Sequence, residues 1–408
     1  MDEFLSVERA REQVLRATPE VGNERVFLSE AAGRRAAESF DAPADSPPFD
    51  NSSRDGYAFR WSDLDDGSAE LELVGRSAAG DAYEGSVGAG SAVRILTGAP
   101  VPDGTDTVAM QEHCEELDGG GRVRVTAPDP GRGAWVRAAG AYISEGQPLI
   151  RAGDRIGSAE VGLLASFGRS LVAVRRRPRV AIVTAGDELV PIDRRPDDDE
   201  IVDSNAHLLA SLVRRHGGEP LVSPIAEDRL EAVEDTFERA LEAADVVVSC
   251  GGVSVGDRDV VGDVITDLTG GLDFWKVRSK PGKPLAFGGV DRQRPVPLLG
   301  LPGNPNSCFV SFHQFVRPAL AVAQGVSPAN AGPDPIRARL GDDVHSTPAR
   351  RQYLAGRLER TGDGPVFHPF EQQKSANLAL FCGADAFGRV EEDVGRMEAG
   401  ERIFVEEF

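Results

Sequence analysis

Carboxylates follow three predicted strands of this chain, and they are the side chains best suited to holding a cation. The segment TAGDEL places Asp187 and Glu188 after one strand, and AED places Asp228 after the next. The segment GGVSVGDRD places Asp257 and Asp259 after a third. Ligands of an open α/β sheet bind beyond the carboxyl ends of its strands. Because Mg²⁺ prefers oxygen ligands and bridges phosphates, this acidic edge predicts metal or phosphate chemistry.

Each of these carboxylates also has a simpler interpretation as a helix cap. Asp228 and Glu231 fit a D-x-x-E capping box, and Asp257 or Asp259 is placed to cap the next helix. Capping is the better interpretation of any one of them alone. Three consecutive acidic strand ends together favour metal or phosphate chemistry.

Two turns that join a strand to a helix are candidate anion sites. SCGGVSVG supplies consecutive backbone N–H groups that can hold an oxyanion, although a purely structural turn is the alternative. LPGNPNS opens a helix that Asn306 or Ser307 can cap, and the helix N-terminus is then available to an anion. Neither turn has the pattern of a P-loop or of a dinucleotide-binding fold.

Lysine is rare in this chain, and its positions are therefore informative. Only four of the 45 basic residues are lysines, and the rest are arginines. Three of the four lie in FWKVRSKPGKP, whose PGKP turn predicts a loop. A compact ammonium group is a good partner for phosphate or another oxyanion. An exposed hairpin is the alternative, but such a hairpin would carry arginine elsewhere in this chain, so we predict an oxyanion site. The four lysines are Lys276, Lys280, Lys283 and Lys374.

The charge of the chain limits its partners. Its 66 acidic and 45 basic residues give a formal net charge of −21. Nucleic acids and anionic membranes need a basic face, so neither is expected as a partner. The acidity is spread along the chain, and with so little lysine it predicts a halophilic archaeon, where the screening length falls to about 3 Å. An ordinary acidic cytosolic enzyme is the alternative.

Cysteine and leader patterns predict a cytoplasmic protein. The four cysteines form no CxxC pair, so neither a disulfide framework nor a zinc knuckle is indicated. The first residues lack the order of a signal peptide, and no apolar stretch approaches the roughly 20 residues needed to span a bilayer. The six histidines show no HxxxH spacing, which argues against a transition-metal site.

Hydrophobic patterning predicts a mixed α/β multidomain protein. Residues 179–326 alternate strands with helices, which is typical of a doubly wound, mostly parallel sheet. Residues 26–140 have short apolar runs between Gly, Pro and Asp, which indicate a β-rich domain. A helical and linker domain, 1–25 and 141–178, surrounds it, and short strands in 333–408 indicate a small β-barrel-like domain.

Six motifs in this order resemble the MoeA family of molybdopterin molybdenumtransferases, which includes the E domains of gephyrin and its plant counterpart. They extend through nearly the whole chain, which makes the match far more specific than one glycine pattern. The motifs are DNSSRDGYA (50–58), RILTGAPVPDGTDTVAMQE (94–112), TAGDEL (184–189), SCGGVSVGDRD (249–259), FWKVRSKPGKP (274–284) and LPGNPNS (301–307).

The resemblance implies an elongated homodimer of four-part subunits whose α/β domain binds molybdopterin. Such enzymes take adenylylated molybdopterin and molybdate as substrates, use a divalent cation to release AMP, and leave the metal on the dithiolene. A molybdopterin adenylyltransferase and molybdenum-enzyme apoproteins are the implied protein partners. Sequence does not distinguish molybdate from tungstate.

The resemblance also assigns residues. Glu188, Asp228 and Asp259 match functional acidic positions that would hold Mg²⁺. Asp55 and Thr97 match functional residues of the second domain, which in the family reaches the partner subunit's site; turn residues are the alternative. The implied ligands of pterin, phosphate or molybdate are Ser249, Gly251, Gly252, Ser254, Gly256, Lys276, Lys280, Lys283, Pro302, Asn304, Ser307, Arg137, Arg350 and Ser375.

Two departures from the family pattern affect the functional hypothesis. Relatives carry an acidic pair where this chain has Ala141 and Tyr142, although Arg137 and Gly140 are kept. A phenol is neither a base nor a cation ligand at neutral pH. The second departure is Lys374, which stands beside Ser375. The alternatives to a molybdenum insertase are a non-catalytic or tungsten-specific paralogue and a molybdopterin adenylyltransferase.

Overall fold

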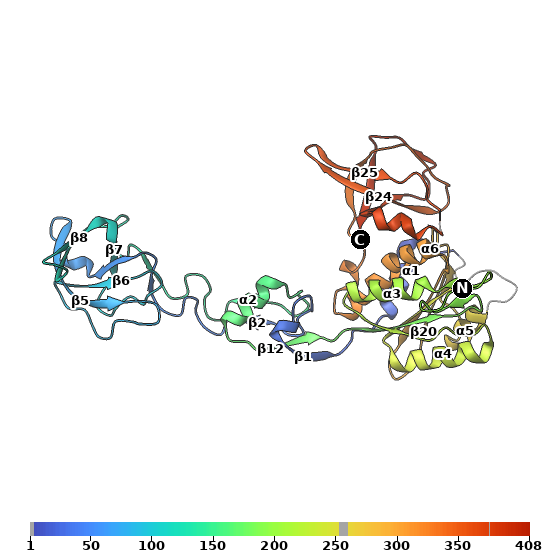
Figure 1. Cartoon of the computed structure of the whole chain (residues 1–408), viewed down its shortest axis with the longest axis horizontal. Coiled ribbons are helices and arrows are strands. Elements are labelled where there is room, and N and C mark those ends of the chain that lie inside the picture. The colour runs from blue at the N-terminus through green and yellow to red at the C-terminus, as the bar shows by residue number, and fades with distance from the viewer. Residues whose placement is uncertain (1–3, 253–259, 375) are drawn as a thin grey trace. The chain divides into compact units, whose positions relative to one another are not determined.

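The computed structural model describes residues 4–252, 260–374 and 376–408 of the 408-residue chain. The chain divides into two compact units, which are described separately (Figure 1). The first unit comprises residues 1–37, 155–157 and 171–408, and the second comprises 38–154 and 158–170. The four-part division expected from sequence stays a prediction.

A six-stranded sheet forms the centre of the first unit. Its first four strands run parallel to one another. The fifth strand pairs antiparallel with the fourth, and the sixth pairs antiparallel with the fifth, so the sheet is mostly parallel as predicted. Every residue of β17 and β21 is buried, as expected for strands covered on both faces. In spatial order the strands are β16 (Glu219–Val222), β13 (Arg179–Thr184), β17 (Val246–Cys250), β21 (Val296–Leu301), β20 (Pro284–Val290) and β18 (Phe274–Lys276).

Helices cover both faces of this sheet, which confirms the doubly wound arrangement (Figure 1). Alternate residues of β13 point to opposite cores: Val180 and Ile182 pack with α1, α3, α6 and α7, whereas Ala181 and Val183 pack with α4 and α5. The helices are α1 (Val7–Ala17), α3 (Ser204–Arg215), α4 (Leu230–Ala243), α5 (Val260–Leu268), α6 (Pro305–Ser311) and α7 (Arg317–Ala323).

The helix that LPGNPNS opens is interrupted, because a π-helical turn over Phe312–Val316 separates α6 from α7. Pro318 has no N–H to donate to the carbonyl of Gln314. That carbonyl instead accepts a hydrogen bond from Arg11 Nε at 2.9 Å. A contact far away in sequence therefore replaces the missing helical bond.

The capping interpretations are wrong for two of the three predicted helices. The N-cap residue of α4 is Arg229, without a side-chain capping bond, so Asp228 does not cap this helix. The N-cap residue of α6 is Asn304, because Pro305 occupies the first helical turn, and neither Asn306 nor Ser307 is the cap. The third interpretation, on Asp257 and Asp259, lies outside the described residues.

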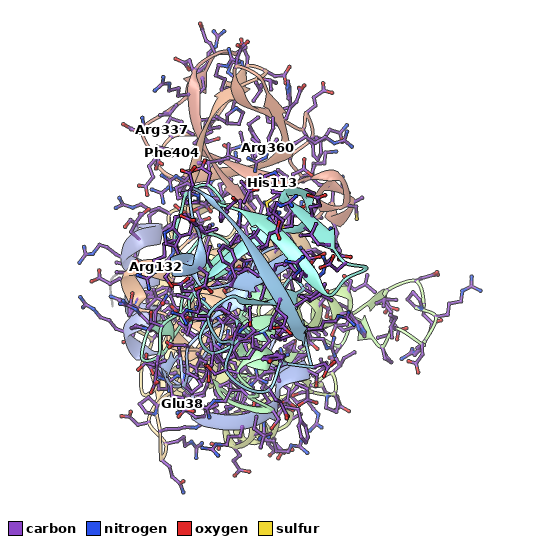
Figure 2. The ribbon with its side chains drawn as sticks, turned by 90° about the vertical axis from the view of Figure 1, so that its left-hand side faces the viewer. Glu38, His113, Arg132, Arg337, Arg360 and Phe404 are labelled. Carbon is purple, nitrogen blue, oxygen red and sulfur yellow. The ribbon has the colours of Figure 1, made fainter. Side chains whose placement is uncertain are left out.

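The C-terminal strands close into the expected small barrel. A pairing between β24 and β26 joins the sheet on itself, and Phe367 is fully buried inside. On its outside the Arg337 guanidinium lies 5.3 Å from the ring centroid of Phe404 (Figure 2). In sheet order the strands are β19 (Ser279–Lys280), β24 (Arg351–Thr361), β25 (Gly364–Pro369), β22 (Ile336–Leu340), β28 (Arg402–Glu407) and β26 (Ala386–Val390), with a separate pair β23 (Val344–His345) and β27 (Arg396–Met397).

The second unit is built around another six-stranded sheet, which confirms a β-rich region. Tyr57, Phe59 and Leu71 fill its core. Its strands in order are β7 (Thr107–Met110), β4 (Gly56–Phe59), β6 (Ser91–Ile95), β5 (Ser68–Ser77), β9 (Arg122–Thr126) and β8 (Cys114–Leu117). The same unit holds α2 (Ser158–Ser166) and the pairs β2 (Phe40–Asp41) with β11 (Pro148–Ile150) and β3 (Asn51–Ser52) with β10 (Val136–Arg137).

The first unit also contains an antiparallel pair of strands, β1 (Asn23–Phe27) and β12 (Leu171–Arg175). No helix within the described ranges has both the length and the apolar character needed to cross a membrane.

Candidate functional site

A cavity of about 440 Å³ lies where β13, β17 and β21 end, and we call it the edge cavity. Parallel neighbouring strands bring their carboxyl ends together, so segments from distant parts of the chain meet here. Five residues predicted from sequence line the edge cavity: Glu188, Gly251, Gly252, Pro302 and Asn304.

The turn after β17 requires glycine. Gly251 and Gly252 have φ values of +93° and +63°, which side chains rarely adopt. A Cβ on Gly252 would also lie 2.5 Å from Cγ2 of Val261. The backbone of this turn therefore approaches the helix that follows it closely. The predicted ligands Ser254, Gly256 and Asp259 lie outside the described residues.

Polar atoms line the edge cavity without partners. Thr184 Oγ1 and Asn205 Oδ1 are buried and have no hydrogen-bond partner among the described residues. The amide nitrogen of Asn205 donates to the carbonyl of Gly303 at 2.7 Å, which orients the side chain. Unpaired buried polar atoms are disfavoured, so a polar ligand here would stabilise the cavity. Ser249, another predicted ligand, is instead buried within β17, and its hydroxyl has no described partner.

The acidic residues meet at this edge only in part. The N–H of Asp228 donates to Oδ1 of Asp187 at 3.0 Å, and Ala185 bridges Ala226, so the first two predicted acidic turns lie side by side. Glu188 lines the edge cavity. Within the described ranges no group of three or more His, Cys, Asp or Glu residues is arranged to hold a metal ion. Asp187 belongs to the acidic edge predicted from the strand ends, although the resemblance assigned no role to it.

A second cavity, of about 480 Å³, is lined by three of the four lysines, and we call it the lysine cavity. Lys280, Lys283 and Lys374 line it together with Arg350 and Ser307, and among the described residues none that lines it is acidic. Four cationic side chains without a lining carboxylate make a site for an anion. Pro284 lines both this cavity and the edge cavity, so the two are neighbours.

Close backbone packing builds the lysine cavity. Strand β19 pairs with β24, and Arg351 N–H donates to the carbonyl of Arg278 at 2.9 Å. Gly282 has a φ of +96°, and a Cβ there would lie 3.0 Å from Oγ of Ser311 on α6. Ala349 adopts a φ of +78°, which is uncommon for a residue other than glycine, immediately before Arg350. The turns that carry Lys280, Lys283 and Arg350 are thus tied to the barrel and to α6.

Individual contacts orient the side chains of the lysine cavity. Lys280 Nζ donates to Oγ1 of Thr347 at 3.1 Å. Asn306 donates from Nδ2 to the carbonyl of Lys374 at 2.7 Å, whereas its buried Oδ1 has no partner among the described residues. Lys276 does not belong to the residues that line this cavity; its ammonium lies 4.8 Å from the ring centroid of Trp275.

Sequence reasoning did not single out several polar residues that line these cavities, among them Thr184, Asn205 and Gln373. Gln373 donates to the carbonyls of Ala355 at 2.9 Å and Phe370 at 2.7 Å, and so anchors the segment that carries Lys374. Its position directly before Lys374 was the available signal. Ser375 lies outside the described residues.

In the second unit the structure brings Asp55 and Thr97 into contact. Oδ1 of Asp55 accepts hydrogen bonds from the main-chain N–H and from the hydroxyl of Thr97, both at 2.7 Å. The main-chain bond, followed by the hydroxyl bond, lowers the pKa of Asp55 from its ordinary value. The pair therefore presents an ionised carboxylate at neutral pH.

Arg137 and Tyr142, which lie at the departure from the family pattern, also meet in the second unit. The Arg137 guanidinium lies 5.0 Å from the ring centroid of Tyr142, and its Nη1 donates to Oδ1 of Asn51 at 3.2 Å. A cation–π contact thus orients the arginine.

Three family models match the chain. The MoeA N-terminal region, domains I and II, matches residues 5–168. A probable molybdopterin binding domain matches 181–322, and the MoeA C-terminal region, domain IV, matches 337–408.

Curated proteins and solved structures are similar along most of the chain. A molybdopterin molybdenumtransferase of a Nostoc species is 38% identical over 84% of this chain and 79% of its own length. One from Haemophilus influenzae is 32% identical over 99% of both chains. The crystal structure of a molybdopterin biosynthesis MoeA protein from Pyrococcus horikoshii has a TM-score of 0.85 at 32% identity, covering 99% of both chains.

Proposed function

This chain belongs to the MoeA family of molybdopterin molybdenumtransferases, and we propose that it inserts molybdate into adenylylated molybdopterin with Mg²⁺ and release of AMP. The observation that carries this proposal is the lysine cavity, where Lys280, Lys283, Lys374 and Arg350 converge without an acidic lining residue. A tetrahedral oxyanion is the ligand that such a group of cations favours.

The lysine cavity would bind molybdate. Lys280 and Lys283 supply ammonium groups, Arg350 supplies a planar fork, and Ser307 supplies a hydroxyl donor. The held contact between Lys280 and Thr347 supports this role, because an oriented ammonium loses little freedom when it binds. Molybdate and tungstate share charge and shape, so either oxyanion suits these residues.

The neighbouring edge cavity would bind the adenylylated pterin. Its unpaired Thr184 and Asn205 oxygens accept hydrogen bonds, and the Gly251–Gly252 turn lets a ligand approach the backbone closely. Since Pro284 borders both cavities, a pterin bound here would be adjacent to the oxyanion that it must receive.

Glu188 and Asp228, with Asp259, would hold Mg²⁺. The described part of the donor set fits a hard cation, because Glu188 lines the edge cavity and Asp228 is joined to Asp187 in the adjoining turn. A bound Mg²⁺ would neutralise charge on the link between pterin and AMP. The residues themselves orient the substrate and hold its phosphates beside the turn after β17.

The functional unit would be a homodimer in which Asp55 and Thr97 serve the site of the partner subunit. Support comes from the family and from the exposed, ionised carboxylate that Thr97 orients. Arg137 stays oriented against Tyr142, which argues for an active enzyme over a non-catalytic paralogue. A molybdopterin adenylyltransferase and molybdenum-enzyme apoproteins are the proposed protein partners, and the cytoplasm is the proposed compartment.

AMP release tests the proposal. Purified protein in concentrated KCl, which suits a net charge of −21, is given adenylylated molybdopterin, Mg²⁺ and molybdate. We expect stoichiometric AMP and a cofactor that activates a molybdenum-dependent apoenzyme. The Lys280→Ala variant should lose both products, whereas Arg337→Gln on the outside of the barrel should keep both. Synthesis of adenylylated molybdopterin from ATP would instead identify an adenylyltransferase.

A further inference from the structure

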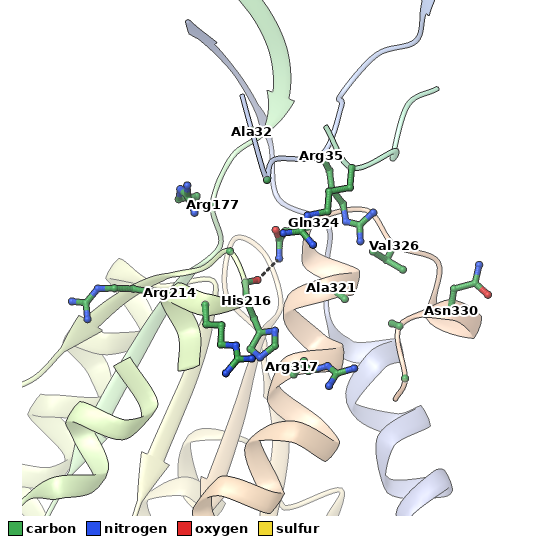
Figure 3. A pocket seen from close by; sticks show the side chains of 16 residues that line it. Ala32, Arg35, Arg177, Arg214, His216, Arg317, Ala321, Gln324, Val326 and Asn330 are labelled. Carbon is green, nitrogen blue, oxygen red and sulfur yellow. Dashed lines mark hydrogen bonds between the residues drawn. The ribbon is translucent and has the colours of Figure 1, made fainter. Parts of the chain in front are cut away.

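A third cavity, of about 490 Å³, lies beyond the amino ends of strands of the central sheet, and we call it the arginine cavity (Figure 3). The turn between the end of α3 and the start of β16 lines it, and so does Arg177, which lies just before β13. These are the amino ends of parallel strands, whereas the edge cavity lies at their carboxyl ends. The arginine cavity is thus separate from the proposed catalytic site.

The charge of the residues that line this cavity is opposite in sign to the net charge of the chain. In the part of the chain that the structure describes, sixteen residues line it, of which six are arginines and none is acidic. In the whole chain 66 of 408 residues are acidic, and the net charge is −21. A concentration of one charge in such a chain points to a ligand of the other charge. The arginines are Arg35, Arg155, Arg177, Arg214, Arg215 and Arg317.

Like charges this close repel one another, and three of the six arginines have no ion pair among the described residues. Within the described residues, Arg155, Arg214 and Arg317 form no ion pair with an acidic side chain. Arg215 donates to the main-chain oxygen of Phe408 at 2.9 Å. Burial lowers the pKa of Arg317; the negative charge of Glu406 opposes this shift, whereas the neighbouring Arg11 and Arg215 add to it. An anion bound among these groups would remove the repulsion.

The centre of the arginine cavity is held in place by hydrogen bonds. Figure 3 shows His216 and Gln324 between Arg35 and Arg317, whereas Arg214 points away. Gln324 Nε2 donates to the carbonyls of His216 at 3.0 Å and Leu320 at 2.8 Å. The turn closes tightly because residue 217 is a glycine with a φ of +83°, and a Cβ there would lie 2.6 Å from Gln324 Oε1.

His216 adds an unsatisfied group to this centre. Its Nε2 is buried and has no hydrogen-bond partner among the described residues. Burial, with the charges of Arg317, Arg215 and Arg155, lowers the pKa of His216 to about 4. The ring is therefore neutral at pH 7 and adds a polar contact but no charge.

We propose that the arginine cavity binds a small polyphosphate, an anion with two or more linked phosphate groups. Guanidinium forks match phosphate oxygens in pairs, which favours this class over a carboxylate on a flexible peptide. Groups from four separate segments, at residues 35, 155, 214–217 and 317–324, surround the space, and one phosphate is too small to contact them all. The cavity volume is in the range of small-ligand sites.

The rest of the surface excludes a long polyanion. Nucleic acid bound here would run onto an acidic chain of net charge −21 and be repelled, whereas a compact ion meets only the cavity. Inorganic triphosphate and a nucleoside triphosphate share the recognised chemistry, so both serve as probes.

Calorimetric titration of the full chain with inorganic triphosphate, and separately with ATP, at one fixed KCl concentration tests the proposal. We expect binding of one or both, weakened about tenfold or more by Arg35→Gln and by Arg317→Gln, because each removes a charge-assisted hydrogen bond. Binding of both probes assigns the phosphate chain as the recognised group, and binding of ATP alone assigns a nucleotide. Arg337→Gln removes the same charge from the barrel surface and should bind as the unaltered protein does.

A stability measurement keeps the test independent of catalysis. Without ligand, Arg317→Gln should raise the unfolding temperature, because it relieves repulsion, and triphosphate should raise that of the unaltered protein more than that of the variant. Lys280→Ala should retain this response even if the proposed insertase activity is absent. Equal affinity in the unaltered protein and both arginine variants, or tighter binding of an oligo-aspartate peptide than of either triphosphate, would overturn the proposal.

Discussion

Asp55 accepts two hydrogen bonds of 2.7 Å from Thr97, one from its main-chain N–H and one from its hydroxyl. The two residues are 42 positions apart and are brought together at the ends of β4 and β6, which pair antiparallel. These bonds lower the pKa of Asp55. Their contribution to stability is complete above the ordinary pKa of an aspartate and is lost as the pH falls through the lowered value.

Subunit complementation tests where Asp55 acts. Asp55→Asn and Lys280→Ala should each abolish AMP release as homodimers. If Asp55 serves the partner subunit's site, mixed dimers contain one intact site, and an equal mixture after dissociation and reassociation should regain about a quarter of full activity. AMP release measures the outcome. No recovery in mixed dimers would show that both residues act within one subunit.

Lys280 and Lys276 should affect different ligands. Lys280 lines the lysine cavity, so Lys280→Ala should weaken molybdate binding about tenfold, as expected for loss of a charged hydrogen bond. Lys276 lies against Trp275 instead, so Lys276→Ala should leave the dissociation constant of molybdate unchanged. Equilibrium dialysis with molybdate compares the two. Unaltered molybdate affinity in Lys280→Ala would contradict the proposed oxyanion site.

Tyr142 should act through its ring. Because Arg137 lies against this ring, Tyr142→Phe should keep AMP release, whereas Tyr142→Ala should lower it several-fold by releasing the arginine. Tyr142→Asp introduces the acidic charge that the family resemblance led us to expect and serves as the comparison. An inactive unaltered enzyme that gains activity only with Tyr142→Asp would favour the non-catalytic paralogue.

The four cysteines should differ in reactivity. Burial raises the pKa of Cys114 to about 12, and the bond with Cys250 and then burial raise that of Cys308. The sulfurs of Cys250 and Cys308 are 3.7 Å apart and buried, whereas Cys382 is exposed. Since the thiolate is the reactive form, iodoacetamide at pH 8 should modify Cys382 first. Mass spectrometry should find one modified cysteine when the folded protein is treated, and four when the unfolded protein is treated.

Asp245 should be important for the stability of the sheet. It is buried, and its carboxylate accepts from Arg176 at 2.6 Å through both oxygens, from Arg294 and from the N–H of Arg179 at 2.8 Å. Asp245→Ala should lower the free energy of unfolding by about 1–3 kcal/mol, because it removes charge-assisted hydrogen bonds and leaves the N–H of Arg179 without its acceptor. Denaturant unfolding at constant KCl measures this change.

The control for Asp245 is Asp235→Ala, which removes an exposed pair with Arg239 on α4. An exposed pair of this spacing contributes about 0.3–0.5 kcal/mol, so this variant should unfold nearly as the unaltered protein does. Similar losses in the two variants would contradict the importance assigned to burial.

Local patterns in the sequence were enough to predict the order and type of most elements. The alternation of apolar strands and amphipathic helices between Arg179 and Gln324 predicted the doubly wound sheet, because the spacing of apolar residues indicates which face of each element is buried. The scarcity of lysine also pointed to one place in the fold, because three of the four lysines line one cavity. The predicted cap residues of α4 and α6 were wrong. α4 begins after Arg229, and α6 begins at Pro305, because backbone geometry at these residues decided where each helix starts.

Sequence alone therefore determined the class of fold and the family, and it supplied the candidate residues for the proposed chemistry. Only the tertiary structure decided which of them meet: Lys280 with Thr347, Asp228 with Asp187, and the arginines near residues 35, 155, 215 and 317. The physical reason is that strand and helix patterns act over a few residues, whereas cavities form where segments far apart in the chain pack together. The hydrophobic effect that drives this packing is non-directional, so the meeting points follow from the packed shape and not from any local pattern.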